Sequence, residues 1–128
     1  MKANELMIGD YVYNHRNWEC TIVEIHKDSA VVIARHYGEE ECLLSDLRPI
    51  PLTSGILEKN FESESNIFGL QTYNLNENFY LEDRGERFCL VRKCQYYNSS
   101  IFWICDLTYL HQLQHALRFC GIEKEIIL

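Results

Sequence analysis

Proline and positive charge are scarce in this sequence. Its 128 residues include two prolines, six isolated glycines, and twelve Lys and Arg side chains against nineteen Asp and Glu, for a net charge of −7. The shortage of basic residues disfavours non-specific nucleic-acid binding and docking on anionic membranes, because both depend on basic patches. Isolated glycines also argue against a phosphate-binding loop, which needs several glycines within a few residues.

Long apolar runs are missing as well. The longest strictly apolar stretches, Ala30–Ala34 and Ile101–Cys105, have five residues each, whereas a membrane-spanning helix needs about 20. Glu5 and Asp10 interrupt the first ten residues, where a signal peptide would need an apolar core. We therefore expect a cytoplasmic protein with no membrane contact.

The six cysteines are the unusual part of the composition. Most lie in apolar stretches such as Phe88–Val91 and Ile101–Cys105 rather than in turns. A free cysteine behaves as a small buried hydrophobe, and thiols stay reduced in the cytoplasm. We expect six free, mostly buried thiols.

One proline cluster, Arg48–Leu52, divides the chain. Pro49 and Pro51 favour extended backbone in the residues before them and cannot donate to a central β-ladder. This predicts one part over residues 1–52 and a second over residues 53–128. Acidic residues outnumber basic ones in both, so neither part is a charged tail.

The first part is rich in β-branched and aromatic residues between short polar turns, a pattern typical of strands. We expect a helical turn at Ser45–Leu47. Several short strands in about fifty residues favour a small barrel, which closes its own edges. The expected strands are Tyr11–Tyr13, Cys20–His26, Ala30–His36 and Glu41–Leu44.

The second part indicates an α+β half built on an antiparallel meander, in the order α-β-β-β-β-α-β. Thr53 is expected to cap a short helix, and residues 62–66 to form a loop. Asp106 is expected to cap a helix over Leu107–Cys120 that Gly121 ends. The expected strands are Phe68–Leu75, Phe79–Glu82, Arg87–Tyr97, Ile101–Cys105 and Glu123–Leu128.

Three segments of the first part, Ile8–Val12, Trp18–Ile25 and Asp46–Pro49, resemble SH3-like barrels of the Tudor and Agenet kind. Such barrels bind peptides, methylated side chains or nucleic acid, so the resemblance implies a binding module and no reaction.

In a barrel of that kind, an aromatic patch would lie at the edge of the binding face and grip cations or proline-rich segments. The alternative is that the tryptophan plugs the end of the barrel. The patch would consist of Tyr13, Trp18 and Tyr37, with Glu39 or Glu40 supplying charge.

Four segments spread over most of the chain, one of which overlaps the barrel resemblance, resemble a group of small uncharacterised proteins that are abundant in gut anaerobic bacteria and their prophage-like elements. That group has no assigned activity, so the resemblance implies an accessory factor and no particular chemistry. The group usually continues Glu-Lys-Asn with Gly-Phe, whereas Phe61 follows Asn60 directly here. The sequence therefore does not identify the residue that caps the C-terminus of the short helix after Thr53. The segments are Leu6–Val12, Ile50–Thr53, Ile56–Asn60 and Tyr109–Arg118.

Cys89 and Cys94, followed by His111 and His115, approximate the spacing of a Cys2His2 zinc site. Residues 90–93 instead indicate a strand, whereas a zinc knuckle needs a tight turn, and side chains five apart on a strand point to opposite faces. Helical periodicity turns both histidines away from the apolar stripe, so we expect them in solvent. We expect no cofactor and assign no catalytic residue.

The only basic cluster could form a nucleic-acid platform on an antiparallel sheet, but neighbouring acids and the overall charge oppose it. The leading interpretation is a non-enzymatic binding or adaptor protein that acts through protein–protein contacts. Nucleic-acid binding is the alternative, an unrecognised enzyme is third, and the aromatic content favours self-association. The cluster consists of Arg84, Arg87, Arg92 and Lys93, interleaved with aromatic residues that include Tyr96 and Tyr97.

Overall fold

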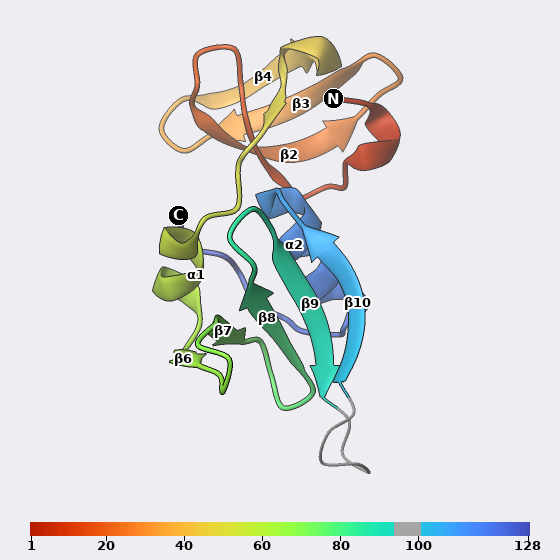
Figure 1. The fold of residues 1–128 in the computed structure, drawn as a ribbon. Coiled ribbons are helices and arrows are strands. Elements are labelled where there is room, and N and C mark those ends of the chain that lie inside the picture. The colour runs from red at the N-terminus through yellow and green to blue at the C-terminus, as the bar shows by residue number, and fades with distance from the viewer. Residues whose placement is uncertain (94–100) are drawn as a thin grey trace. The chain divides into compact units, whose positions relative to one another are not determined.

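The structure, a computed structural model, describes residues 1–93 and 101–128. These residues form an α+β fold with two antiparallel five-stranded sheets and two α-helices (Figure 1), and this fold class confirms the prediction. The chain divides into two compact units. The first is Met1–Pro51 with Tyr109–His111, and the second is Leu52–Thr108 with Gln112–Leu128.

The first unit is built on a sheet with the strand order β4-β3-β2-β1-β5. The predicted strands and helical turn are confirmed, with boundaries shifted by up to three residues. No ladder joins β4 to β5 among the described residues, so the closed barrel stays a prediction. The elements are η1 Ala3–Glu5, β1 Tyr11–Tyr13, β2 Glu19–Ile25, β3 Ser29–Ala34, β4 Gly38–Leu43, η2 Leu44–Asp46 and β5 Arg48–Pro49.

Burial alternates along β3, so every second side chain faces the core of the first unit. The buried Ala30 and Val32 of β3 lie opposite Cys42 and Glu40 of β4. Residues paired across two strands share a face, so β4 turns Glu40 and Cys42 toward the core side of the sheet.

The second unit has the strand order β10-β9-β8-β7-β6. One face of its sheet carries Tyr73, Leu81 and Leu90, which are paired across β7, β8 and β9 and are 1% exposed or less. This is the core face of the unit. The elements are α1 Ser54–Asn60, β6 Ser63–Ser65, β7 Gln71–Asn74, β8 Phe79–Asp83, β9 Phe88–Lys93, β10 Ile101–Leu107 and α2 Leu110–Phe119. The first two residues of α2 belong to the first unit.

Both helices of the second part have ends that the sequence predicts. Oγ1 of Thr53 accepts a hydrogen bond from the N–H of Ile56, 3.3 Å away, and so caps α1. Gly121 has a φ of 72° after α2, and the N–H of Ile122 donates to the carbonyl of Leu117. That bond closes the helix with a left-handed glycine.

Two expectations for the second unit are wrong: a strand forms where a loop is predicted, and the predicted helix cap lies in a strand. β6 lies in the predicted loop, because its exposed polar residues give no apolar signal while its backbone pairs with β7. Asp106 lies inside β10 and does not cap a helix, since its backbone pairs with Cys89 of β9 and α2 begins only at Leu110.

The expected last strand, Glu123–Leu128, is also wrong. The backbone of Ile127 is satisfied by a side chain instead of a ladder: its N–H donates to Oδ1 of Asn60 at 2.7 Å, and its carbonyl accepts from Nδ2 at 2.8 Å. One asparagine on α1 therefore holds the end of the chain without any strand.

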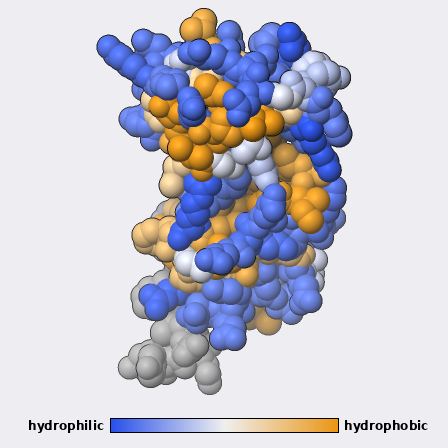
Figure 2. All heavy atoms as spheres, turned by 180° about the vertical axis from the view of Figure 1, so that it is seen from behind, coloured by the Kyte–Doolittle hydropathy of each residue, from blue (hydrophilic) through white to orange (hydrophobic). Residues whose placement is uncertain are grey.

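The surface seen from behind in Figure 2 is largely hydrophilic, with apolar side chains gathered in patches. No helix among the described residues is long and apolar enough to cross a membrane. The five described cysteines are free, and Cys20, Cys42 and Cys89 are buried. Cys94 lies outside the described residues.

Candidate functional site

A row of polar side chains crosses the second sheet on the face opposite its core. Thr72 pairs with Glu82, Glu82 with Cys89, and Cys89 with Asp106. Because residues in register point to the same face, the four side chains lie side by side from β7 to β10. Two carboxylates and a thiol are thus brought together from three strands.

Asp106 is the centre of one part of this row. Its Oδ2 lies 3.2 Å from Nη1 of Arg87, and its Oδ1 accepts hydrogen bonds from Sγ of Cys89 at 3.2 Å and Nε1 of Trp103 at 3.3 Å. Burial and this hydrogen bond to Asp106 raise the pKa of the Cys89 thiol, in that order of size. Cys89 is therefore a protonated donor at neutral pH and a poor nucleophile.

Glu82 is the second carboxylate, and its side chain is 8% exposed. It forms an ion pair with Arg84 and accepts a hydrogen bond from Nδ2 of Asn66 at 3.3 Å. The partner arginines Arg84 and Arg87 are 53% and 60% exposed, while the side chain of Asp106 is 29% exposed. Each acid is thus less exposed than the arginine with which it is paired, so the charged surface here consists mainly of guanidinium groups.

An open groove of about 620 Å³ lies over this network. Its apolar walls are Phe68, Leu70, Val91 and Trp103. Phe68 and Trp103 are 78% and 61% exposed. The groove thus combines exposed aromatic rings with exposed arginines.

The turn that presents Phe68 is fixed before any ligand arrives. Oδ1 of Asn66 accepts from the N–H groups of Phe68 and Leu70 at 2.9 and 3.0 Å, and Gly69 takes a φ of 78°. This is the local bonding that asparagine and glycine give to turns. Nδ2 of the same Asn66 donates to Glu82, which fastens the turn to the sheet.

The structure divides the predicted basic cluster. Arg84 and Arg87 line the groove. Because side chains alternate along β9, Arg92 and Lys93 point to opposite faces of the sheet. Lys93 donates to Oδ1 of Asn74 at 3.4 Å. Tyr96 and Tyr97, the aromatic residues predicted to accompany the cluster, lie outside the described residues.

The predicted aromatic patch of the first unit is brought together in part. The rings of Trp18 and Tyr37 stack with their centroids 4.1 Å apart, beside a pocket of about 280 Å³. The guanidinium of Arg16 lies 4.9 Å from the Trp18 centroid. The cation that contacts this indole ring is therefore a side chain of the same protein and not a ligand. Tyr13 is half-buried on β1, and Glu39 is exposed on β4.

The predicted zinc spacing gains no support from the described residues. Cys94 lies outside them, and Cys89 belongs to the second unit whereas His111 belongs to the first. His115 is half-buried.

The expectation that His111 lies in solvent is wrong, since its exposure is 6%. Its ring lies nearly parallel to that of Tyr109, with the centroids 6.0 Å apart. The backbone of Tyr109–His111 is tied to the first unit through Pro51 and Ile50, which a helical periodicity does not register.

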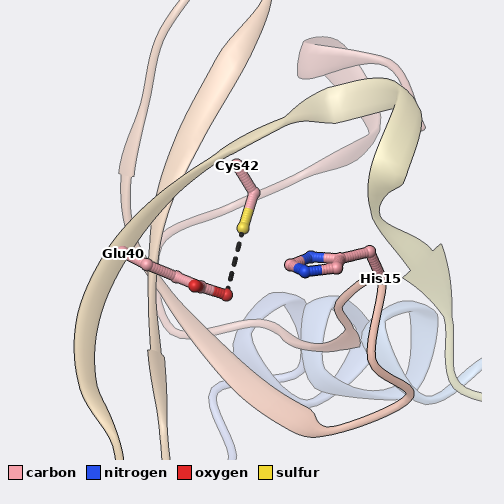
Figure 3. Close-up of side chains that lie close together, drawn as sticks. All are labelled: His15, Glu40 and Cys42. Atoms are coloured by element: carbon pink, nitrogen blue, oxygen red, sulfur yellow. Dashed lines mark hydrogen bonds between the residues drawn. The ribbon is translucent and has the colours of Figure 1, made fainter.

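A cluster that the sequence analysis did not single out lies in the first unit. The ligand atoms of His15, Glu40 and Cys42 all lie within 4.8 Å of one another. Figure 3 shows the imidazole, the carboxylate and the thiol turned toward a common point, with a hydrogen bond of 3.5 Å from Sγ of Cys42 to Oε1 of Glu40. In the described part of the chain, it is the one group of three such side chains with this spacing.

A buried asparagine positions this cluster. Asn14 is fully buried at the end of β1, and its Oδ1 accepts from the N–H groups of Arg16 and Trp18 at 2.9 and 3.0 Å. Its Nδ2 donates to Oε1 of Glu40 at 3.1 Å. The loop that carries His15 is therefore tied to the strand that carries the other two side chains.

The thiol of the cluster is not poised for nucleophilic chemistry. Burial raises the pKa of Cys42 to about 11, helped by the hydrogen bond to Glu40 and by its charge. A thiol enzyme needs the opposite shift, which creates a thiolate at neutral pH.

No protein-family model, curated protein or solved structure matches the chain.

Proposed function

We propose that this protein is a non-enzymatic adaptor that binds another protein through the groove of its second unit. The segment it takes is an acidic stretch of chain that also carries a bulky apolar side chain. The observation that supports this most directly is the difference in exposure of the paired charges in the groove, where Arg84 and Arg87 are exposed and Glu82 and Asp106 are less so.

The apolar walls support the second half of the proposal. Phe68 and Trp103 both line the groove and are exposed. Aromatic rings and arginines are the side chains enriched at protein interfaces. A ring of this size buries about 150 to 250 Å² when fully covered. The fixed turn at Asn66 lowers the ordering cost of binding, because Phe68 is already presented.

The remaining parts of the proposal concern the first unit and its setting. We propose that residues 1–52 form an SH3-like barrel, which their five short antiparallel strands support. The resemblance to proteins of gut anaerobes and prophage-like elements supports a cytoplasmic accessory factor. Self-association stays a proposal that depends on the exposed apolar side chains of the second unit.

Fluorescence anisotropy of labelled probes tests the proposed function. The probes are a peptide of Glu and Leu residues with one Trp, the same peptide with Lys in place of Glu, and a single-stranded oligonucleotide. We expect the acidic peptide to bind most tightly, and Arg87→Gln and Trp103→Ala each to weaken it about tenfold, the loss of about 1.4 kcal/mol.

Arg92→Gln is the matched control, because it removes a charge from β9 on the face opposite to Cys89 and Val91, which line the groove. Equal binding of the acidic and basic peptides would contradict the proposal. The proposal would also be contradicted if the oligonucleotide bound more tightly than the acidic peptide and lost its binding at raised salt concentration. That salt dependence is the signature of phosphate contacts.

A further inference from the structure

We infer that His15, Glu40 and Cys42 form a binding site for one zinc ion in the first unit. The site is independent of the groove and of the proposed adaptor function, because all three side chains come from the β1–β2 loop and β4. It also differs from the zinc spacing that the sequence suggests, with which it shares no residue.

The types of donor select the metal. A thiolate and an imidazole are ligands for zinc and other late transition metals, whereas calcium and magnesium take oxygen ligands almost exclusively. One carboxylate oxygen completes a set of sulfur, nitrogen and oxygen. Zinc accepts all three, and with three protein ligands its fourth tetrahedral position is left for water.

The observed spacing fits a tetrahedral ion. With Zn–S and Zn–O bonds of about 2.3 and 2.0 Å, a tetrahedral angle places sulfur and oxygen about 3.5 Å apart. Sγ of Cys42 and Oε1 of Glu40 already lie 3.5 Å apart. The imidazole of His15 is within 4.8 Å of both and is exposed, so a small side-chain movement brings its nitrogen into range.

The surroundings orient the carboxylate as a ligand. Oε1 of Glu40 accepts from Nδ2 of Asn14 at 3.1 Å, and Oε2 lies 3.7 Å from Nη1 of Arg16. Metal-binding carboxylates are held by such outer partners, whose loss typically weakens metal binding 10- to 100-fold. Asn14 is buried and also fixes the loop of His15, so one residue aligns ligands from two elements.

Binding exchanges one proton for the ion. The Cys42 thiol, which donates to Glu40 in the metal-free protein, gives up its proton to solvent and binds zinc through its sulfur lone pair. Glu40 binds through a carboxylate oxygen and His15 through a lone pair on one ring nitrogen. Exposed His15 gives the ion a route in from solvent, while buried Cys42 forms the closed end.

Titration of the full-length, reduced protein with Co²⁺ tests the site, because cobalt takes the tetrahedral sites of zinc and makes them visible. We expect one equivalent per chain, a thiolate-to-cobalt charge-transfer band, the visible bands of tetrahedral cobalt, and their loss when Zn²⁺ is added. Cys42→Ser should remove the charge-transfer band. His15→Ala should weaken binding at least tenfold, and Asn14→Ala by 10- to 100-fold.

Two matched controls separate this site from other thiols and imidazoles. Cys20→Ser removes another buried thiol of the same unit, and His36→Ala removes another exposed histidine. Both should retain the bands and the affinity. Circular dichroism of each metal-free variant shows whether it is folded, and His15→Ala keeps the test decisive if Cys42→Ser unfolds.

The inference is overturned if the folded protein gives no charge-transfer band. It is also overturned if the band survives Cys42→Ser, or if Cys20→Ser or His36→Ala lowers the affinity as much as His15→Ala does. Because these readouts do not involve the groove, failure here leaves the proposed adaptor function untouched, and loss of peptide binding leaves the zinc site untouched.

Discussion

Replacement of Asn14 should lower the stability of the first unit strongly, although it changes the volume of the side chain little. It is fully buried, and its side chain makes three hydrogen bonds, two from backbone N–H groups of its own loop and one to Glu40. Asn14→Ala removes all three. At about 1 kcal/mol net for each bond, we expect a loss of about 3 kcal/mol in the free energy of unfolding.

That loss is large for a unit of this size. A folded chain of about fifty residues has a total stability of roughly 2.5 to 8 kcal/mol, from about 0.05 to 0.15 kcal/mol per residue. With a urea m-value of about 1.5 kcal/mol per molar, the midpoint should fall by about 2 M.

A pair of substitutions, Asn14→Asp and then Glu40→Gln, measures the bond between Asn14 and Glu40 separately from the bonds within the loop. Asn14→Asp keeps the oxygen that accepts from the loop but faces Glu40 with a second carboxylate, about 3 Å away, which costs roughly 1 to 5 kcal/mol at effective dielectric constants of 80 to 20. Adding Glu40→Gln removes the repulsion and supplies a new donor. We expect the double variant to recover to within about 1 kcal/mol of the natural protein.

Urea unfolding followed by Trp18 fluorescence measures these effects. The chain has two tryptophans, so all variants are made in a Trp103→Phe background, where the emission reports the first unit alone. The reasoning is refuted if Asn14→Ala costs less than 1 kcal/mol. It is equally refuted if Glu40→Gln fails to rescue Asn14→Asp, because the coupling would then be absent.

Three further predictions concern the second unit, each measured by thermal or urea unfolding against the natural protein. Gly121→Ala should cost about 1 kcal/mol through backbone strain alone, because φ is 72° and an added Cβ would have no atom within 4 Å; a neutral result would contradict a left-handed helix end. Asn60→Ala should cost about 2 to 3 kcal/mol and speed amide exchange at Ile127, since it removes three hydrogen bonds to backbone groups; unchanged exchange would show that something else holds the chain end. Thr53→Ala should cost about 1 kcal/mol while Thr53→Ser costs little, because only the hydroxyl caps α1; an equal loss in both variants would assign the effect to the lost methyl group.

The candidate sites show where prediction from the sequence stops. Arg84, Arg87 and Trp103 attract notice as charged and aromatic residues, but the carboxylates that pair with the two arginines come from β8 and β10. Asp106 is the clearest case. Its sequence context, before an apolar helical pattern, favours a helix cap, yet its backbone pairs with β9.

The His15 cluster had one weak signal in the sequence. Glu40 and Cys42 are two residues apart and therefore share a face of β4, although the strand predicted from the sequence begins only at Glu41. Nothing along the chain relates them to His15, which is 25 residues earlier and is brought to them by the asparagine-fixed loop.

The sequence by itself determined the local structure of this protein: the strands of the first unit, the capped start of α1, the glycine end of α2 and the overall α+β class. These features depend on side-chain alternation, turn residues and caps, whose interactions span only a few residues. The tertiary structure alone decided the strand β6, the burial of His111, the pairing of charges in the groove and the meeting of His15 with Glu40 and Cys42. Each of these depends on hydrogen bonds or packing between residues far apart in the chain, and a single sequence carries no periodic signal for such pairs.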